Sequence, residues 1–456
     1  MFLGCPKNQV DSEIVLGSLT EAGYSLTTDP RSANLIVITT CAFLQSAVRE
    51  SEAAIAEALK HKQGGANKKV VVAGCLVERY GKSLKRKFPA VDLWVPLRDM
   101  PRIAQLLTPP SSLLSPPSGD SAICNLESRI CNRPSRLSHL ASRLSPRVLS
   151  TPGHFAYLKI ADGCDNRCSY CMIPDIRGPF RSRPMRDIIA EATELASIGV
   201  KELILVAQDT TLYGADFRTG VHHKDTKTQS RRNPPQLAKL LKELGKVDGI
   251  RWLRLLYTHP AHLTEDVIDQ FASNPKLCRY IDLPIQHVAD HLLAKMNRGY
   301  TRKDVELLLD NLRAIPDMHV RTTIIVGLPG ETEHDFAELL AFVRAARFDR
   351  LSCYAYSPEP GTRAARMSGQ VSPAVKKERV RRLMLAQAAI SRANLKKLVG
   401  RKLTVLVDSP GIGRTQWDAP EIDGVVKLSG RRVNPGRFVQ ALVNGSSTHD
   451  LTARVL

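Results

Sequence analysis

Three cysteines on one short stretch are the residues best able to do chemistry in this chain of 456 residues. The stretch "KIADGCDNRCSYCMIP" spaces them as Cys164-x3-Cys168-x2-Cys171. Three thiolates on one loop suit a metal ion or an iron–sulfur cluster. Zinc in a closed structural site would want a fourth ligand, and no further cysteine or histidine lies nearby in the sequence. A [4Fe–4S] cluster on three cysteines would leave one iron open to chelate a small molecule through amine and carboxylate groups.

A second set of three cysteines is spread along the start of the chain. Cys41 ends the apolar run "LIVITTC" and Cys75 ends "VVVAGC", and both runs are rich in Val and Ile, as buried parallel strands are. Cys5 follows "FLG", which we expect to end a third strand. Because open α/β sheets bind ligands at the carboxyl ends of their strands, the three cysteines are predicted to converge on one edge. The alternative is three unrelated buried thiols.

The elements that must position these cysteines follow a strand–helix pattern. Between the two N-terminal runs, residues 46–62 have apolar residues at helical spacing and no Pro or Gly, which predicts a βαβ unit. Farther along, six apolar runs alternate with helical stretches, at 156–161, 202–208, 252–257, 280–286, 321–327 and 350–357. Six βα units predict a parallel sheet curled into a partial barrel, with the active site at the carboxyl ends of its strands.

Changes in composition divide the chain further. Residues 103–150 are rich in Ser, Pro and Arg and are interpreted as a linker, and the polar, basic stretch 214–235 as an inserted loop. After a helix near 373–398, short alternating strands predict a small antiparallel barrel. We therefore expect an α/β protein composed of an N-terminal α/β domain with a parallel sheet (1–102), the linker (103–150), the barrel core (151–382) and a lead-in helix with the small barrel (383–456).

The charge balance is strongly basic, with 65 Lys and Arg against 45 Asp and Glu, a formal net charge of +20. This excess predicts a polyanionic partner, RNA first, although a basic surface without a specific target is the alternative. The sequence has neither a signal peptide nor an apolar run near the roughly 20 residues of a membrane helix. A cytoplasmic protein without a membrane partner is expected, so its ten cysteines are not expected to form disulfides.

Together these motifs resemble a known family. The Cys164 loop after the first strand of a partial (βα)6 barrel resembles the radical S-adenosylmethionine superfamily. The N-terminal cysteines and a terminal barrel of the TRAM type resemble its methylthiotransferases. Four motifs resemble the branch that modifies a ribosomal protein, namely "LGCPKN" (3–8), "PIQH" (284–287), "YSPEPGT" (356–362) and "DAPEIDG" (418–424). Only Met1 and Phe2 precede the first motif, so either the native start lies upstream of Met1 or the strand before Cys5 is short.

The resemblance implies two [4Fe–4S] clusters and S-adenosylmethionine as cofactors. The implied metal ligands are Cys164, Cys168 and Cys171 for the cluster that binds S-adenosylmethionine, and Cys5, Cys41 and Cys75 for the cluster that carries the sulfur. It further implies a 5′-deoxyadenosyl radical that takes hydrogen from an unactivated carbon, and a second S-adenosylmethionine that supplies the methyl group. In this branch the acceptor is the β-carbon of an aspartate in the twelfth small-subunit ribosomal protein.

Four further residues are expected to bind the cofactor. Gln208, at the end of the second barrel strand, is placed to hydrogen-bond the amino group of S-adenosylmethionine, or else it caps a turn. Gly327, Gly330 and Glu331 lie in "VGLPGE" after the fifth strand, where glycines let the backbone approach an adenine or ribose. An ordinary strand-ending turn is the alternative.

Catalytic roles are left open. Arg181 and Arg183 follow the cluster loop and could meet a carboxylate bidentately, or they belong to a solvated basic loop. His259 and His287 lie at strand ends, and neither is assigned as a catalytic base. No catalytic residue is therefore predicted.

Expected partners follow from charge and resemblance. An acidic loop contains Asp418, Glu421 and Asp423, and we expect it to face a Lys/Arg-rich loop of the ribosomal protein. Basic surface elsewhere is expected to contact ribosomal RNA. The sequence leaves open whether the ribosomal protein is modified free or in the assembled subunit. A low-potential electron donor such as flavodoxin or ferredoxin is implied, and a monomer is expected. The alternatives are the same chemistry on adenosine 37 of transfer RNA, and a zinc-stabilised RNA-binding protein without catalysis.

Overall fold

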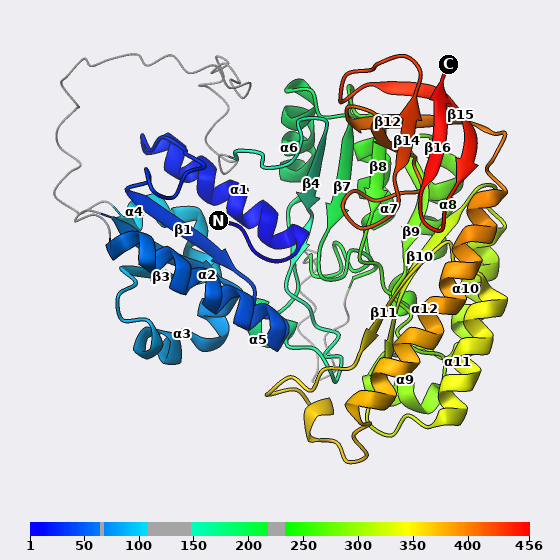
Figure 1. Cartoon of the computed structure of the whole chain (residues 1–456), viewed down its shortest axis with the longest axis horizontal. Helices are drawn as coiled ribbons and strands as arrows, with labels where there is room; N and C mark the ends of the chain where they lie inside the picture. The colour runs from blue at the N-terminus through cyan, green and yellow to red at the C-terminus, as the bar shows by residue number, and fades with distance from the viewer. Residues whose placement is uncertain (64–67, 108–146, 218–232) are drawn as a thin grey trace, which may run out of the picture.

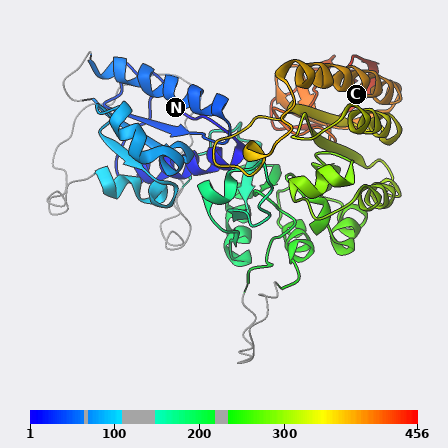
Figure 2. The ribbon, with the colours of Figure 1, turned by 90° about the horizontal axis from the view of Figure 1, so that it is seen from below.

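The computed structural model describes residues 1–63, 68–107, 147–217 and 233–456. These residues form an N-terminal sheet with helices, a central sheet of parallel strands, and a small C-terminal barrel (Figure 1). Seen from below, the N-terminal part and the C-terminal barrel lie on opposite sides of the molecule (Figure 2). None of the helices in the described ranges is long and apolar enough to cross a membrane.

The N-terminal sheet has three strands, all parallel, in the order β1 (Leu35–Thr40), β2 (Lys69–Gly74) and β3 (Leu93–Val95). Its helices are α1 (Pro6–Glu21), α2 (Gln45–Gln63) and α3 (Cys75–Lys87), followed by the 3-10 turn η1 (Leu97–Arg102) and the short α4 (Ile103–Leu107). β2 is buried along almost its whole length, as its continuous apolar sequence predicts for a central parallel strand.

The strand expected before Cys5 is a single bridge. Phe2 pairs with Thr39 as an isolated parallel bridge. Thr39 donates its N–H to the carbonyl of Met1 at 3.0 Å, and Leu3 donates to the carbonyl of Thr39 at 3.0 Å. The start of the chain thus runs alongside β1 and carries Cys5 to its carboxyl end, although it makes too few ladder bonds to count as a strand.

The central sheet contains the six expected strands, all parallel, in the order β11-β10-β9-β8-β7-β4. Their bounds are β4 (Phe155–Lys159), β7 (Glu202–Val206), β8 (Trp252–Leu255), β9 (Leu277–Asp282), β10 (His319–Val326) and β11 (Arg350–Ala355). The helices and turns between them are α5 (Ile173–Arg177), α6 (Met185–Ser197), α7 (Leu237–Gly245), η3 (Pro260–His262), α8 (Glu265–Ser273), α9 (Asp290–Met296), α10 (Arg302–Arg313) and α11 (Glu333–Ala346), and the turn η4 (Ala364–Arg366) follows β11. β4 and β11 do not pair, so the barrel is partial, as expected.

Alternation along the strands gives the sheet two covered faces. In β8, Leu253 and Leu255 belong to the large core that the helices cover. Trp252 belongs to a separate cluster on the other face, with Val10 of α1 and Leu406 of the C-terminal barrel. The inner face of the partial barrel is therefore closed by both flanking parts of the chain.

The C-terminal barrel follows the long helix α12 (Pro373–Lys396). Its strands are β12 (Lys402–Ser409), β13 (Ile412–Arg414), β14 (Val426–Ser429), β15 (Phe438–Ser446) and β16 (Leu451–Val455), closed in the order β12-β13-β14-β16-β15. The expectation of an antiparallel barrel needs one correction, because β14 and β16 pair in parallel. β15 lies between these two strands in sequence, so their parallel pairing closes the barrel without a tight turn.

Buried charges fix the small barrel on the central sheet. The fully buried Arg254 of β8 donates to Glu202 of β7 at 2.7 Å and to the carbonyl of Gln416 at 2.8 Å. Arg414 of β13 reaches the second carboxylate oxygen of Glu202 at 2.9 Å. Because a buried carboxylate is costly without partners, this set specifies how the two parts dock.

The two segments predicted to be peripheral are described only at their ends. Of the predicted linker 103–150, residues 103–107 form α4, and Arg147 donates to Glu13 at 2.7 Å and to Glu191 at 2.6 Å. Residues 108–146, and residues 218–232 of the loop 214–235, lie outside the described ranges.

Candidate active site

The cysteine loop of the barrel is held by local backbone pairing. After β4, β5 (Ala161–Asp162) pairs with β6 (Arg181–Ser182) in antiparallel fashion and closes the loop that carries the three cysteines. Gly163 has φ +77°, and a Cβ there would lie 2.1 Å from the carbonyl of Pro179, so only glycine fits. Cys164 donates its N–H to the carbonyl of Gly178 at 3.1 Å. The loop is thus shaped before any ligand binds.

The three thiols of this loop fit an iron–sulfur cluster. Burial raises the pKa of both Cys164 and Cys171 to about 12, so these sulfurs need a cation before they ionise at neutral pH. The N–H of Ile173 points to Cys171 Sγ at 3.4 Å. A guanidinium nitrogen of Arg298 lies 3.5 Å from Cys168 Sγ. Donors directed at sulfur are what a thiolate-bound cluster uses, which makes this donor set suitable for one.

Unpartnered polar groups beside the loop indicate room for a ligand. Both side-chain amide atoms of Gln208 are buried and have no hydrogen-bond partner among the residues that the structure describes, and the same holds for Oγ of Ser169 and Nε2 of His259. Buried polar groups are nearly always hydrogen-bonded in native proteins. An unsatisfied amide at Gln208 therefore fits the predicted contact with the amino group of S-adenosylmethionine.

Sequence reasoning missed Asp209, the next residue. Its carboxylate accepts from Asn166 of the cysteine loop at 2.8 Å and pairs with Nδ1 of His262 at 2.8 Å. Burial opposes its ionisation, but hydrogen bonds from His262 and Thr211 lower the pKa of Asp209 to about 2. The "QD" pair at the end of an apolar run was the available signal, because a charged residue rarely ends a buried strand without a partner.

Asp209, His259 and His262 lie within metal-binding distance of one another, but their hydrogen bonds argue against a metal. Both carboxylate oxygens of Asp209 already accept donors. Nδ1 of His259 accepts from the N–H of Ala261 at 3.2 Å, so the proton of its neutral ring sits on Nε2, which is then a donor and not a ligand. Burial lowers the pKa of His259 to about 2, which keeps the ring neutral.

The "VGLPGE" turn follows β10 on the same edge of the sheet. Gly327 and Gly330 both have positive φ, and Cβ atoms there would lie 2.3 Å from Lys376 and 2.5 Å from Lys295. The Glu331 carboxylate accepts from Leu328 N at 3.1 Å and binds Arg379 at 3.0 Å. Glu331 therefore shapes this turn from inside, and its carboxylate is not free to face a ligand.

The N-terminal cysteines meet at the carboxyl ends of β1 and β2. Cys5 precedes α1, Cys41 follows β1, and Cys75 opens α3. Asn8 ties this edge together, since its side chain donates to the carbonyls of Leu3 at 3.2 Å and Thr40 at 3.0 Å. The topology thus brings three distant cysteines to one place.

The thiols of this second set act on one another electrostatically. Burial raises the pKa of Cys75 to about 12, with Arg177 opposing this rise and charge on Cys5 and Cys41 contributing to it. Burial also raises the pKa of Cys41. For Cys5, burial opposes ionisation, but Lys7 and Arg177 lower the pKa. Mutual influence of one buried and two half-buried thiols, with cations nearby, suits a second thiolate-bound cluster.

Arg177 joins the two cysteine sites. It ends α5, directly after the barrel cysteine loop, and binds Asp162 at 2.9 Å and Asp11 of α1 at 2.9 Å. The same guanidinium lies 3.6 Å from Cys75 Sγ. A second tie links Arg79 of α3 to the buried Glu359, in the segment after β11, at 3.4 Å. The N-terminal set is thereby held over the barrel edge that carries the other set.

The acidic loop 418–424 does not face outward as expected. Asp418 is buried and binds Arg350 and Thr415. Asp423 accepts from the hydroxyl of Tyr280 at 2.6 Å. The expectation that these residues meet a basic partner is therefore wrong for Asp418 and Asp423, because their carboxylates already bind arginines and a tyrosine of the central sheet. Glu421 alone of the three is exposed.

The predicted arginines and His287 occupy different settings. Arg181 is exposed, whereas Arg183 pairs with Glu191 at 2.6 Å. His287 is fully buried, and its Nδ1 accepts from the N–H of Ala289 at 3.0 Å. These contacts are structural and give none of the three a catalytic partner within the described ranges.

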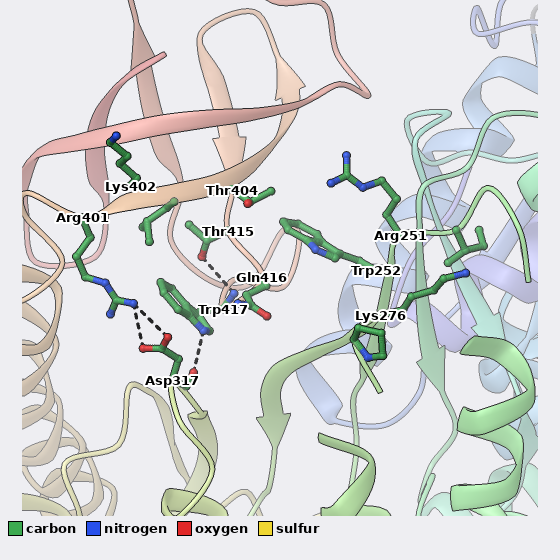
Figure 3. Close-up of a pocket in the computed structure, with 13 residues that line it drawn as sticks. Arg251, Trp252, Lys276, Asp317, Arg401, Lys402, Thr404, Thr415, Gln416 and Trp417 are labelled. Carbon is green, nitrogen blue, oxygen red and sulfur yellow. Dashed lines mark hydrogen bonds and ion pairs between the residues drawn. The ribbon is translucent and has the colours of Figure 1, made fainter. Parts of the chain in front are cut away.

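A cavity of about 560 Å³ lies between the central sheet and the C-terminal barrel (Figure 3). Its cations are Arg251 and Lys276, just before β8 and β9, and Arg401 and Lys402 at the start of β12. Asp317 is the acid of its lining, and it pairs with Arg401 at 3.1 Å (Figure 3). This cavity is at the amino ends of the strands, away from the cysteines, and carries an excess of positive charge.

Comparison with known proteins covers the whole chain. Residues 158–343 match the model of the Radical SAM superfamily, residues 1–96 that of the Uncharacterized protein family UPF0004, and residues 399–456 that of the TRAM domain. The ribosomal protein uS12 methylthiotransferase RimO of Geobacter sulfurreducens is 40% identical, over 100% of this chain and 97% of its own length. The RimO of Pelotomaculum thermopropionicum is 43% identical, over 100% and 98%.

Among solved structures, the radical S-adenosylmethionine methyltransferase TsrM of Kitasatospora setae, with tryptophan and an analogue of S-adenosylmethionine bound, has a TM-score of 0.54. It is 15% identical, and the match covers 92% of this chain and 77% of TsrM. This likeness shows the fold.

Proposed function

This chain belongs to the ribosomal protein uS12 methylthiotransferase (RimO) family, and from this premise we propose that it adds a methylthio group to the β-carbon of an aspartate in uS12. The observation that carries the proposal is the pair of three-cysteine sites, which Arg177 joins at one edge of the barrel. Sulfur insertion at an unactivated carbon needs a radical site and a sulfur site within reach of one substrate. The two sets provide a place for each.

The cofactors supply the hard chemistry. Two [4Fe–4S] clusters and S-adenosylmethionine provide, when bound, a carbon radical that removes hydrogen from the substrate, a sulfur atom, and a methyl group. The residues that would hold the first cluster are Cys164, Cys168 and Cys171, and those that would hold the second are Cys5, Cys41 and Cys75.

The remaining site residues bind, orient and exclude water. The unsatisfied amide of Gln208 would hydrogen-bond the amino end of S-adenosylmethionine. Gly327 and Gly330 keep the turn after β10 close to the barrel, while Glu331 holds that turn in shape. Burial around the cysteines keeps water from a reactive radical.

The identity of the product tests the proposal directly. Reconstituted enzyme with S-adenosylmethionine, a reductant and uS12 should yield uS12 that is heavier by one methylthio group on a single aspartate, measured by tandem mass spectrometry. Transfer RNA offered in parallel should be unchanged. Modified adenosine 37 with unmodified uS12 would instead support the transfer-RNA alternative, and a colourless protein that contains zinc would support the non-catalytic one.

The basic cavity between the sheet and the C-terminal barrel is our candidate for contact with ribosomal RNA. Arg251 and Lys402 are exposed on its opposite walls and pair with no acid in the described ranges. Binding to RNA phosphates releases counterions, so each contact steepens the salt dependence of binding. The double change Arg251→Gln and Lys402→Gln should lower the slope of log affinity for the small subunit against log salt by about 2.

The matched control is the double change Lys82→Gln and Lys85→Gln at two exposed lysines of α3. Its net charge equals that of the Arg251→Gln and Lys402→Gln variant. A slope reduced equally by both pairs would mean a diffuse basic surface and contradict a contact at the cavity. We further propose that electrons come from a low-potential donor such as flavodoxin or ferredoxin, and that the enzyme acts as a cytoplasmic monomer.

A further inference from the structure

Lys7 is a buried cation without an anion. It is the second residue of α1, two positions after Cys5, and its exposed fraction is 7%. Its ammonium makes no hydrogen bond or ion pair with any residue in the described ranges, and it lies over the ring of Tyr257, 3.3 Å from Nζ to the ring centroid. Lys376, equally buried, shows the usual solution, because it donates to the carbonyl of Tyr356 at 2.9 Å.

Lys7 lies between the N-terminal cysteine set and the carboxyl-terminal edge of the barrel. Tyr257 comes just after β8, at the carboxyl-terminal edge of the barrel, in the left-handed conformation with φ +61°. Its N–H donates to Asp282 at 3.0 Å, at the end of the neighbouring strand β9. Lys7 therefore reaches from the N-terminal part of the chain across to the barrel edge.

No carboxylate in the described part of the chain is left to neutralise Lys7. Two carboxylates act on Lys7 at longer range, and both have other partners. Asp282 is bound by Arg321 at 2.8 Å and by the N–H of Tyr257, and Asp162 is bound by Arg177 at 2.9 Å and by Lys159 at 3.2 Å. The thiol of Cys5 is assigned to the second cluster, beside which Arg177 already provides a cation. An aromatic face stabilises an ammonium on one side only, so the N–H donors of Lys7 that point away from the Tyr257 ring remain available to a ligand.

We propose that Lys7 binds the side-chain carboxylate of the acceptor aspartate and thereby fixes its β-carbon between the two sites. This inference rests on the proposed function, which makes an aspartate the substrate. The carboxylate is bonded directly to the β-carbon, so holding one positions the other. A compact ammonium can rotate its donors to a single carboxylate oxygen, and in a site with little water the pair is stronger than at a surface.

Lys7 also accounts for selection of the substrate. An asparagine in place of the aspartate presents a neutral amide, which leaves the buried ammonium without a counter-charge. The site should therefore reject the amide although it has nearly the same shape. Discrimination of this kind depends on a charged group that is left unpaired by the wrong substrate.

The test uses the reconstituted full-length enzyme and two synthetic peptides of the uS12 loop, one with the acceptor aspartate and one with asparagine there. We expect the wild type to bind the aspartate peptide about 10- to 100-fold more tightly, the range of one charge-assisted hydrogen bond. Lys7→Met should bind both peptides equally, at the affinity that the wild type has for the asparagine peptide. Lys7→Arg, which keeps the charge, should retain a preference for aspartate.

Controls separate this inference from other effects. Iron and sulfide per chain are measured in each variant, and Lys82→Met, an exposed lysine of α3, serves as the matched control and should keep the full preference. The inference would be overturned if the Lys7→Met variant still preferred the aspartate peptide. It would also be overturned if this variant lost affinity for both peptides by the same factor. A wild type that neither prefers nor methylthiolates the aspartate peptide would contradict the proposed function itself.

Discussion

The two cysteine sites reach similar chemistry by opposite means. Cys164, Cys168 and Cys171 lie on one loop, shaped by β5–β6 pairing and backbone hydrogen bonds. The N-terminal set comes from three segments, separated by whole strands and helices. One site is encoded locally, and the other exists only when the sheet has formed. The local site should therefore tolerate changes elsewhere in the chain, while the other should fail when a tertiary contact is lost.

The means of support differ in the same way. Side-chain hydrogen bonds and ion pairs hold the N-terminal set, whereas backbone hydrogen bonds hold the barrel loop. Asn8 holds the segments before Cys5 and after β1, and the buried Arg177 binds two carboxylates beside Cys75. Removing one partner of a buried ion pair is strongly destabilising. The N-terminal set should therefore be disrupted when a single supporting side chain is changed.

The largest effect should come from a cysteine of the barrel loop. Cys168→Ala should lose about four iron atoms and all release of 5′-deoxyadenosine, because it removes a ligand of the cluster that binds S-adenosylmethionine. The N-terminal site should keep its iron. Iron analysis and chromatography of the nucleoside products measure both results. Cys278→Ala, a buried cysteine of β9 assigned to no cluster, is the control and should keep all iron. Loss of iron from both sites in Cys168→Ala would contradict their independence.

A smaller effect, confined to the other site, should follow from Arg177→Met. The change removes the guanidinium from Asp11 and Asp162 and leaves Lys159 as the cation that both still contact, so we expect a loss of about 1–3 kcal/mol in the free energy of unfolding. The N-terminal cluster should be retained poorly and the barrel cluster well. Denaturant titration and iron analysis measure these results. Arg181→Met, a change at an exposed arginine, should lower neither the free energy of unfolding nor the iron of the N-terminal cluster. Equal stability of the two variants would refute the role given to Arg177.

The smallest effect concerns a neutral histidine at the rim of the barrel and depends on pH. Burial lowers the pKa of His287 to about 4, whereas the unfolded chain has an ordinary value near 6.5. Its neutral form thus contributes stability above pH 6.5 that is lost as the pH falls toward 4. Between pH 7 and pH 5 the wild type should lose roughly 2 kcal/mol more unfolding free energy than His287→Gln. Equal losses, measured by urea titration at both pH values, would show that His287 is not held neutral.

The sequence predicted the local features of the fold better than the contacts between its parts. Spacing alone indicated the cluster loop, and apolar runs placed the strands that end at Cys41 and Cys75. The parallel pairing of β14 with β16 was not predicted, because it joins segments that are not neighbours in sequence. Asp418 and Asp423 were expected at the surface because acidic residues usually are exposed, and only the structure reveals their arginine and tyrosine partners.

The same division runs through the site. Gln208 was placed correctly at a strand end, but its lack of a partner could not be read from sequence. The role of Arg298 beside Cys168 was not foreseen, since 130 residues separate them. Lys7 lies in the "LGCPKN" motif, yet its lack of an acidic partner among the described residues depends on how Asp282 and Arg321 pair. Residue type and spacing predict ligands, whereas tertiary packing decides which charges are left free.

Iron and acid-labile sulfide per chain, after anaerobic reconstitution of the wild type and of Cys5→Ala, test the central claim most directly. Two clusters predict about eight iron atoms in the wild type and about four in Cys5→Ala, with release of 5′-deoxyadenosine retained. About eight iron atoms in both proteins would show that Cys5 is not a ligand. About four in the wild type would contradict the second cluster, and with it the account of two sites that serve one reaction.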